Sequence, residues 1–286
     1  MAGNLIAVAE GRDSLFATLD AEGIVTIWSG PGEMRSQFSA DFARVSVPVP
    51  SRRLAIVAGS ETASVVVGSW SQGVIAYDLA GANLWHRSDI HHVQHLRAIR
   101  SETSEHSILT VIRERGGGLI LGPTGGTKYR VDKAQFLDGW PDTSLLVFDG
   151  KNVSRRSSPY SESSWKLELR TFAVLDAVVG DGALICGADG ILTYLEGSGD
   201  LVWRMPVGEG RRVVSARAYP HSDEWLCLSV SNRPGGPRIL RITRDGQVAA
   251  SVDLPGNWID FVCGGRFVVA SSGVVAQVPD FTDAPA

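Results

Sequence analysis

The sequence lacks the markers of several protein classes. Its 286 residues contain only 3 cysteines, an odd number that cannot form a complete disulfide framework. No apolar run approaches the roughly 20 residues that a membrane-spanning helix needs. The start, MAGNLIAVAEGRD, has no basic residue before its short apolar run, which favours a strand over a signal peptide. We therefore expect a cytoplasmic protein with buried free thiols at Cys186, Cys227 and Cys263.

The net charge of the chain is also small. The formal net charge is -4, so the chain has no overall attraction for nucleic acid or for an anionic membrane, and we expect neither as a partner. The basic pairs Arg155–Arg156 and Arg211–Arg212 are too short to form a nucleic-acid stripe. In contrast, 44% of the residues are hydrophobic and 32 are glycine, which suits a large core with many tight turns.

No helical periodicity is needed to explain the chain. The stretch Val65–His86 consists of short apolar runs separated by Gly, Ser and Asn, as in antiparallel strands joined by tight turns. The same pattern recurs in Ala183–Val207, where Trp203 takes the place of Trp85, and less sharply in Ser14–Ser39. A strand-only repeat with a period of about 40 residues is typical of a β-propeller blade.

The repeats predict an all-β fold consisting of one β-propeller of about seven four-stranded blades, with six or eight as alternatives. The propeller would span residues 1–281, followed by a short flexible tail at 282–286. The polar stretch Asn152–Tyr160 predicts an exposed or irregular third strand in blade four. The last blade lacks a fourth strand of its own, and we expect the other terminus or the insertion at Arg44–Pro50 to supply it.

Two segments resemble known repeat families. Gly73–Trp85 and Gly190–Trp203 share a strand-opening glycine, a tyrosine and a final tryptophan, and they resemble the repeat of pyrroloquinoline-quinone-type propellers. Gly23–Trp28, GIVTIW, is similar to the third strand of a WD repeat. The resemblance implies the fold. Quinoprotein enzymes of that family hold their cofactor with adjacent cysteines and long inserted loops, which this chain lacks, so we expect no cofactor.

Arg, Trp and His side chains gather on the loops that would share one face of a propeller. These loops join each fourth strand to the next first strand and each second strand to the third. Arg and Trp are enriched among interface anchors, so the face predicts a surface for docking another protein. The alternative is scattered solvated arginines and blade-packing tryptophans. The residues are Trp70, His91, His92, Arg113, Arg115, Arg170, Arg211, Arg212, Arg233 and Trp258.

Three aspartates take equivalent positions in the first strands of three blades, in the sequences FLDGW, VLDAV and WIDFV. Inner strands line a propeller axis, so Asp138, Asp176 and Asp260 are candidates for a shared central channel, with Arg97 as a neutralising partner. The alternative, which we favour, is that each carboxylate accepts backbone N–H bonds from a neighbouring blade. The segment Asp89–His95, DIHHVQH, holds three histidines. If a strand begins at Val93, His91 and His95 point to one side and His92 to the other, so at most two converge and we assign no metal site.

Two classes of function fit these observations. The first, which we prefer, is a non-catalytic propeller that docks a partner protein, as a toxin-neutralising immunity protein or a subunit of a larger complex would. The second is a hydrolase or lyase that acts on a small molecule through the channel carboxylates, with or without a metal. We assign no catalytic residue, and the sequence does not set the oligomeric state.

Overall fold

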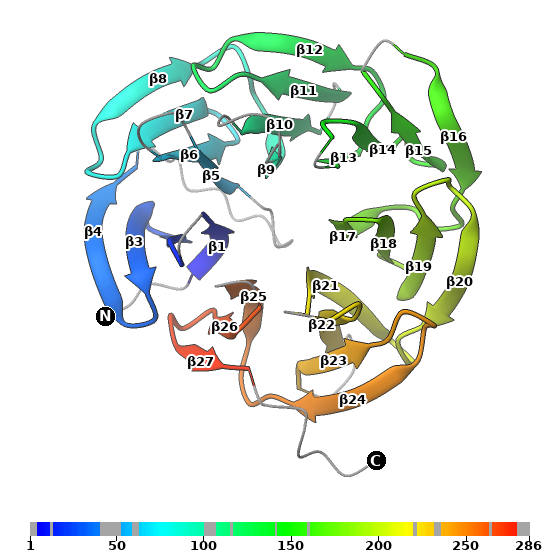
Figure 1. The fold of residues 1–286 in the computed structure, drawn as a ribbon. Coiled ribbons are helices and arrows are strands. Elements are labelled where there is room, and N and C mark those ends of the chain that lie inside the picture. Colours follow the sequence, from blue (N-terminus) through cyan, green and yellow to red (C-terminus); the bar gives the residue numbers. More distant parts are fainter. Residues whose placement is uncertain are drawn as a thin grey trace. The chain divides into compact units, whose positions relative to one another are not determined.

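The computed structural model describes residues 5–11, 14–40, 53–58, 63–99, 107–114, 117–140, 142–158, 161–219, 222–231, 236–262 and 265–278. These residues form strands, turns and loops and contain no helix. Within them, no helix is long and apolar enough to cross a membrane. The strands make seven antiparallel sheets, which are the blades of a seven-bladed β-propeller (Figure 1). The predicted fold class is therefore confirmed.

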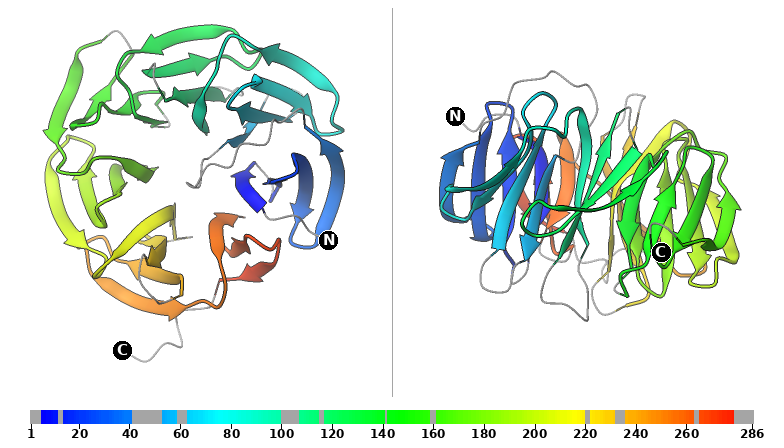
Figure 2. Two further views of the ribbon diagram at one scale, coloured as in Figure 1. Left: turned by 180° about the vertical axis from the view of Figure 1, so that it is seen from behind. Right: turned by 90° about the horizontal axis from the view of Figure 1, so that it is seen from above.

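The chain divides into two compact units, residues 1–168 and residues 169–286. The first unit holds four blades, formed by β1 (Leu5–Glu10), β2 (Phe16–Asp20), β3 (Ile24–Gly30), β4 (Glu33–Ser39), β5 (Leu54–Ala58), β6 (Ala63–Ser69), β7 (Gly73–Asp78), β8 (Asn83–Arg87), β9 (Val93–Ile99), β10 (Ile108–Arg113), β11 (Gly117–Leu121), β12 (Thr127–Val131), β13 (Phe136–Gly139), β14 (Leu145–Phe148), β15 (Asn152–Arg156) and β16 (Ser163–Glu168). Figure 2 shows their succession from two further sides.

The second unit holds three blades. They are formed by β17 (Val174–Val179), β18 (Gly182–Gly187), β19 (Ile191–Glu196), β20 (Leu201–Pro206), β21 (Arg211–Ala218), β22 (Trp225–Ser231), β23 (Arg238–Ile242), β24 (Val248–Asp253), β25 (Trp258–Val262), β26 (Phe267–Ala270) and β27 (Val275–Gln277). In both units the strands of a blade follow chain order, so each blade is a meander of neighbouring hairpins.

Two sequence-based expectations concern single blades. The third strand of blade four, β15, is partly buried rather than exposed, and it pairs with both β14 and β16; a register shift between Arg155 and Arg156 in its pairing with β16 makes it irregular at that point. The sheet β25–β26–β27 has three strands in the described part of the chain, and β1 belongs to a sheet with β2, β3 and β4. The described residues of the N-terminal segment therefore do not complete the last blade. The insertion Arg44–Pro50 lies outside the described residues.

The core lies between consecutive blades of each unit. Every strand of a propeller blade presents alternate side chains to two neighbours, which explains why β6 and β18 are continuously buried rather than alternating. In the first unit, Leu19 and Ile27 of blade one pack in the same apolar cluster as Val65 of blade two. In the second unit, one cluster likewise joins blades five and six.

The recurring tryptophans attach one blade to the next. The indole Nε1 of Trp85 in β8 donates to the Pro123 carbonyl at 2.8 Å, and its ring covers Gly125. Trp203 in β20 repeats this arrangement on Arg244 O, also at 2.8 Å, and on Gly246. Both glycines have a positive φ, where a side chain is strained, and a Cβ at either would lie 2.7 Å from the indole. This contact with the next blade explains why a tryptophan recurs at the end of both repeats.

Candidate partner-binding surface and buried carboxylates

Trp70 and His92, both predicted as docking residues, lie against each other in the first unit. Their rings stack with centroids 4.6 Å apart and an interplanar angle of 6°. The His92 N–H donates to the Trp70 carbonyl at 2.8 Å, while the His92 carbonyl accepts from the N–H of Glu114 at 3.0 Å. His92 has a φ of 57°, a left-handed conformation that is uncommon for a residue other than glycine. The backbone therefore fixes this partly exposed pair.

Arg53 lies beneath the pair. Its side chain is buried, with 2% of the residue exposed, and its guanidinium carbon lies 6.0 Å from the centroid of the Trp70 ring. Among the described residues its Nε and Nη2 atoms have no hydrogen-bond partner, and burial lowers the pKa of the guanidinium. The Glu114 carboxylate lies 3.7 Å from the Nδ1 of His92. An indole, an imidazole and charges of both signs thus meet at one place.

The other predicted docking residues of the first unit are less tightly held together. His91 is exposed and Arg113 is partly exposed at the end of β10. Arg115 lies outside the described residues. Of these residues, Trp70 and His92 are in contact in the structure, and His91 is the residue that precedes His92 in the chain.

In the second unit, Arg170 is exposed on the segment between β16 and β17. The side chains of this segment alternate, so the neighbouring Leu169 and Thr171 are buried while Phe172 is 73% exposed. Arg170 also lines a pocket of about 240 Å³ on the face of blade five, together with Thr171, Ile185, Asp189, Thr193 and Arg204. An exposed phenyl ring beside a cationic pocket edge is a surface that a protein partner can use.

The remaining predicted docking residues of this unit differ in accessibility. Arg211 is partly exposed and donates through Nη1 and Nη2 to the Gly236 carbonyl, each at 3.3 Å. Arg212 is partly exposed, but its Nε is buried and has no hydrogen-bond partner in the part of the chain that the structure describes. Trp258 is 9% exposed and packs in the core between blades six and seven, with its indole N–H on the Pro255 carbonyl. Trp258 therefore offers little surface. Arg233 lies outside the described residues.

Asp176 and Asp260 flank one arginine in the second unit. Arg217 lies 3.4 Å from Asp176 through Nη1 and 2.8 Å from Asp260 through Nη2. Asp176 is fully buried and also accepts the N–H groups of Ala177 and Ala216, both at 2.8 Å. Asp260 accepts the Phe261 N–H at 2.8 Å and the Ser215 hydroxyl. These bonds fasten β17, β21 and β25 to one another.

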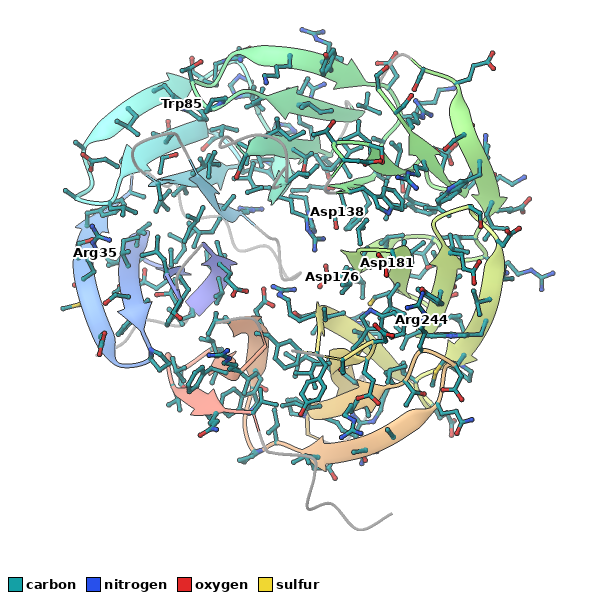
Figure 3. All side chains as sticks on the ribbon, viewed as in Figure 1. Arg35, Trp85, Asp138, Asp176, Asp181 and Arg244 are labelled. Atoms are coloured by element: carbon teal, nitrogen blue, oxygen red, sulfur yellow. The ribbon has the colours of Figure 1, made fainter. Side chains whose placement is uncertain are left out.

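Asp138 has the same surroundings in the first unit. Its Oδ1 accepts the N–H of Gly139 at 2.9 Å and lies 3.3 Å from the Nε of Arg97 on β9. Each of the three aspartates thus accepts the N–H of the next residue and pairs with an arginine of a neighbouring blade. Figure 3 labels Asp138 on β13 and Asp176 on β17. Asp176 accepts a backbone N–H from a neighbouring blade, that of Ala216, as the favoured interpretation expects. The backbone donors to Asp138 and Asp260 are instead Gly139 and Phe261, the next residues in the chain, so the interpretation is not confirmed for these two.

The histidines of Asp89–His95 have different neighbours. His92 stacks on Trp70, while His95 packs edge-on against Phe136 at 5.5 Å. Asp89 is held by Arg87, whose hydrogen bond lowers the pKa of the carboxyl to about 2. In the described ranges, no group of three or more His, Cys, Asp or Glu side chains is placed to hold a metal ion.

The sequence predicts buried free thiols at three cysteines, and two of them lie in the described residues. Cys186 and Cys227 are buried free cysteines, which confirms the prediction for these two. Burial and the nearby negative charge of Asp176 raise the pKa of the Cys227 thiol, so it stays protonated at neutral pH. Cys263 lies outside the described residues.

Sequence reasoning missed four residues of these clusters. Phe172 could have been found from the alternation of its segment, because Arg170 and Phe172 must share a side if Leu169 and Thr171 are buried. Arg217 precedes an alanine near the end of a first strand, as Arg97 does, so the repeat alignment carried its signal. Arg53 and Ser215 had no such signal, since their roles depend on which loops and strands meet.

Comparison with known proteins supports the fold. The structure is similar to BamB from Moraxella catarrhalis, with a TM-score of 0.64, 14% identity, and coverage of 99% of this chain and 84% of that chain. It is also similar to the Cps50 (Swd1) β-propeller domain of Myceliophteria thermophila, with a TM-score of 0.72, 10% identity and 98% coverage of both chains. The C-terminal WD40 domain of Sif2 gives a TM-score of 0.61 at 11% identity, covering 98% of this chain and 97% of that one.

These likenesses concern the β-propeller fold. BamB is a pyrroloquinoline-quinone-like propeller and the other two are WD40-type propellers, which confirms the fold-level resemblance expected from the repeats. At identities of 14% and below, the likeness concerns the fold alone. No family model and no curated protein matches the sequence.

Proposed function

We propose that this chain is a non-catalytic interaction propeller that docks a partner protein through the loops carrying the Trp70–His92 pair. Propellers of the kinds it resembles are commonly protein-interaction scaffolds. The observation that supports the proposal most strongly is the fixed, partly exposed stack of Trp70 on His92. A side chain that is already held in one conformation loses little entropy when a partner covers it, which favours its use as an anchor.

The second unit supports the proposal independently. Phe172 is 73% exposed, more than any other large apolar side chain of the described residues, and Arg170 is exposed two positions before it. Phe172 and Arg170 form a second candidate contact surface with aromatic and cationic character. We propose that the protein acts in the cytoplasm, as an immunity protein that occludes a toxin or as a subunit of a larger complex.

The carboxylates favour a structural role over a catalytic one. Asp176 and Asp260 accept backbone N–H groups and share the charge of Arg217, and Asp138 is paired with Arg97. A general base needs a lone pair directed at a substrate. We therefore do not propose that these groups perform a reaction.

The proposal is tested by capturing partners on the tagged full-length protein and measuring the affinity of each purified partner for single variants. Trp70→Ala and Phe172→Ala are expected to weaken a true partner at least about fivefold, as an anchor residue does. Tyr129→Ala is the matched control, because Tyr129 is an exposed aromatic residue, 38% accessible, on the outer strand β12. Unchanged affinity in both anchor variants, with folded protein by circular dichroism, would contradict the proposal.

A further inference from the structure

Among the residues that the structure describes, none forms a fourth strand at the outer edge of the last blade. Its sheet is β25–β26–β27, whereas each of the other six sheets has a fourth strand in the described parts of the chain (Figure 1). β27 pairs with β26 through Val275, Ala276 and Gln277. On the other side of β27 the described residues provide no neighbouring strand. An edge of this kind is a template for pairing with another chain.

The register identifies the backbone groups that face the open side. The Val278 N–H donates to Arg266 O at 2.9 Å, and the Ala270 N–H donates to Val274 O at 2.8 Å. Residues 274, 276 and 278 therefore direct their backbone groups toward β26, because antiparallel pairs alternate. It follows that Val275 and Gln277 direct their N–H and C=O groups away from β26, toward the position of a fourth strand.

This edge also lacks the protection that exposed edges usually have. Every other outer strand, β4, β8, β12, β16, β20 and β24, carries at least one charged side chain. The sequence of residues 274–278 is VVAQV, without charge or proline. Charges and prolines are what normally prevents an edge from pairing. Phe267 and Val275, on the sheet face that does not join the core cluster with blade six, remain partly exposed.

We propose that an extended segment of a partner protein adds to β27 as the fourth strand of this blade. The strands that already take this position show what such a segment looks like. Most carry a partly buried aromatic residue between exposed neighbours, namely Phe38, Trp85, Trp165 and Trp203. Their direction is always antiparallel to the third strand, as the pairing of β7 with β8 shows.

The charge near the edge gives the segment a further property. Arg266 is exposed and is the single charged residue of 265–278. It lies opposite Val278, the end of β27 at which an antiparallel segment begins. The partner segment is therefore extended, has a central aromatic residue, and carries an acidic residue near its start. The residues of this edge differ from those of the Trp70–His92 loops, and the proposal does not depend on the function proposed for those loops.

The test uses the full-length, ¹⁵N-labelled protein and a blocked peptide, DANLWHR, which is the sequence of residues 81–87 with aspartate in the first position. The peptide is expected to shift the amide signals of Val275 and Gln277 saturably and to slow their hydrogen exchange. A peptide with alanine in place of tryptophan, and one with glycine in place of aspartate, are expected to bind more weakly.

The matched variants are Gln277→Pro and Gln277→Ala. Gln277 is exposed and its N–H faces the open edge, so proline removes one ladder donor without breaking a bond to β26. We expect affinity to fall about fivefold in Gln277→Pro and to persist in Gln277→Ala. Equal binding by both variants, or peptide-induced shifts elsewhere only, would overturn the proposal.

Two other occupants are distinguished by the same sample. Self-association that Gln277→Pro abolishes would identify a second copy as the occupant and overturn the proposed partner. Protection of the Val275 and Gln277 amides before peptide is added would assign the edge to a segment of this chain and would also overturn the proposal. Loss of that protection in a chain that ends at Val278 would identify residues 279–286 as the segment, and its persistence would indicate the N-terminal residues or the insertion Arg44–Pro50.

Discussion

Arg217 is the cation shared by two acidic side chains, so replacing it with methionine removes the charge and keeps a long apolar stem. Asp176 is fully buried and Asp260 is 7% exposed. In Arg217→Met both carboxylates lose their cation while they remain shielded from water. Removing one partner of a buried ion pair costs about 3–5 kcal/mol, because the charge left behind is uncompensated.

The expected loss of unfolding free energy in Arg217→Met lies at the lower end of the range for breaking a buried ion pair. Asp176 keeps the N–H groups of Ala177 and Ala216, and Asp260 keeps the N–H of Phe261 and the hydroxyl of Ser215. These donors stabilise the ionised carboxylates in part. We therefore expect Arg217→Met to lower the free energy of unfolding by about 3 kcal/mol.

The assay is denaturant-induced unfolding followed by tryptophan fluorescence, with Arg238→Met as the control. Arg238 pairs with Asp253 at 2.7 Å, a distance similar to that between Arg217 and Asp260, but the Asp253 side chain is 67% exposed. Exposed pairs contribute less than about 1 kcal/mol. If Arg217→Met and Arg238→Met both lower the free energy of unfolding by the same small amount, the buried cluster does not hold the blades of this unit together.

Three further predictions concern the fold. Gly125→Ala is expected to cost about 1–2 kcal/mol in thermal or denaturant unfolding, because Gly125 has a φ of 78° and covers Trp85, whereas Gly126→Ala, with open space around it, should change little. Burial opposes the ionised form of Asp149. Hydrogen bonds from Asn152 and the Lys151 N–H, together with the charge of Lys166, outweigh burial and lower the pKa of the Asp149 carboxyl. The stability that ionised Asp149 contributes is therefore complete above about pH 4 and is lost as the pH falls further. The stability difference between the protein and Asp149→Asn, about 1 kcal/mol at pH 7, should therefore shrink below pH 4, and a difference independent of pH would contradict this assignment. Iodoacetamide at pH 8, followed by peptide mass mapping, should leave Cys186 and Cys227 unmodified until the chain is unfolded, because both are buried and the pKa of the Cys227 thiol is raised.

The blade repeat could be predicted because its signals are local. Alternating strands, glycine turns and the tryptophan at the end of each clear copy all lie within about 40 residues of sequence, and Trp85 and Trp203 do form equivalent contacts. The three strands of the last blade were also visible, since the apolar pattern ends after Val278. What closes that blade was not, because a pairing between distant segments leaves no local pattern.

The candidate surface was only partly predictable. The loop positions of Trp70 and His92 followed from the repeat, but their stacking depends on the left-handed backbone of His92, which no local pattern required. Trp258 was predicted as a docking residue together with Trp70, yet it is the first residue of β25 and packs in the core, because its burial depends on the neighbouring blade. For the same reason the buried Arg53 beneath Trp70 was not anticipated.

The central claim is that a partner protein covers the Trp70–His92 pair. The most direct measurement is hydrogen–deuterium exchange of the full-length protein with and without a purified partner. The account predicts slower exchange in the β6–β7 turn at Trp70 and in the β8–β9 loop at His92, and none of this protection with the Trp70→Ala variant. A tight complex that leaves exchange in both loops unchanged would contradict it.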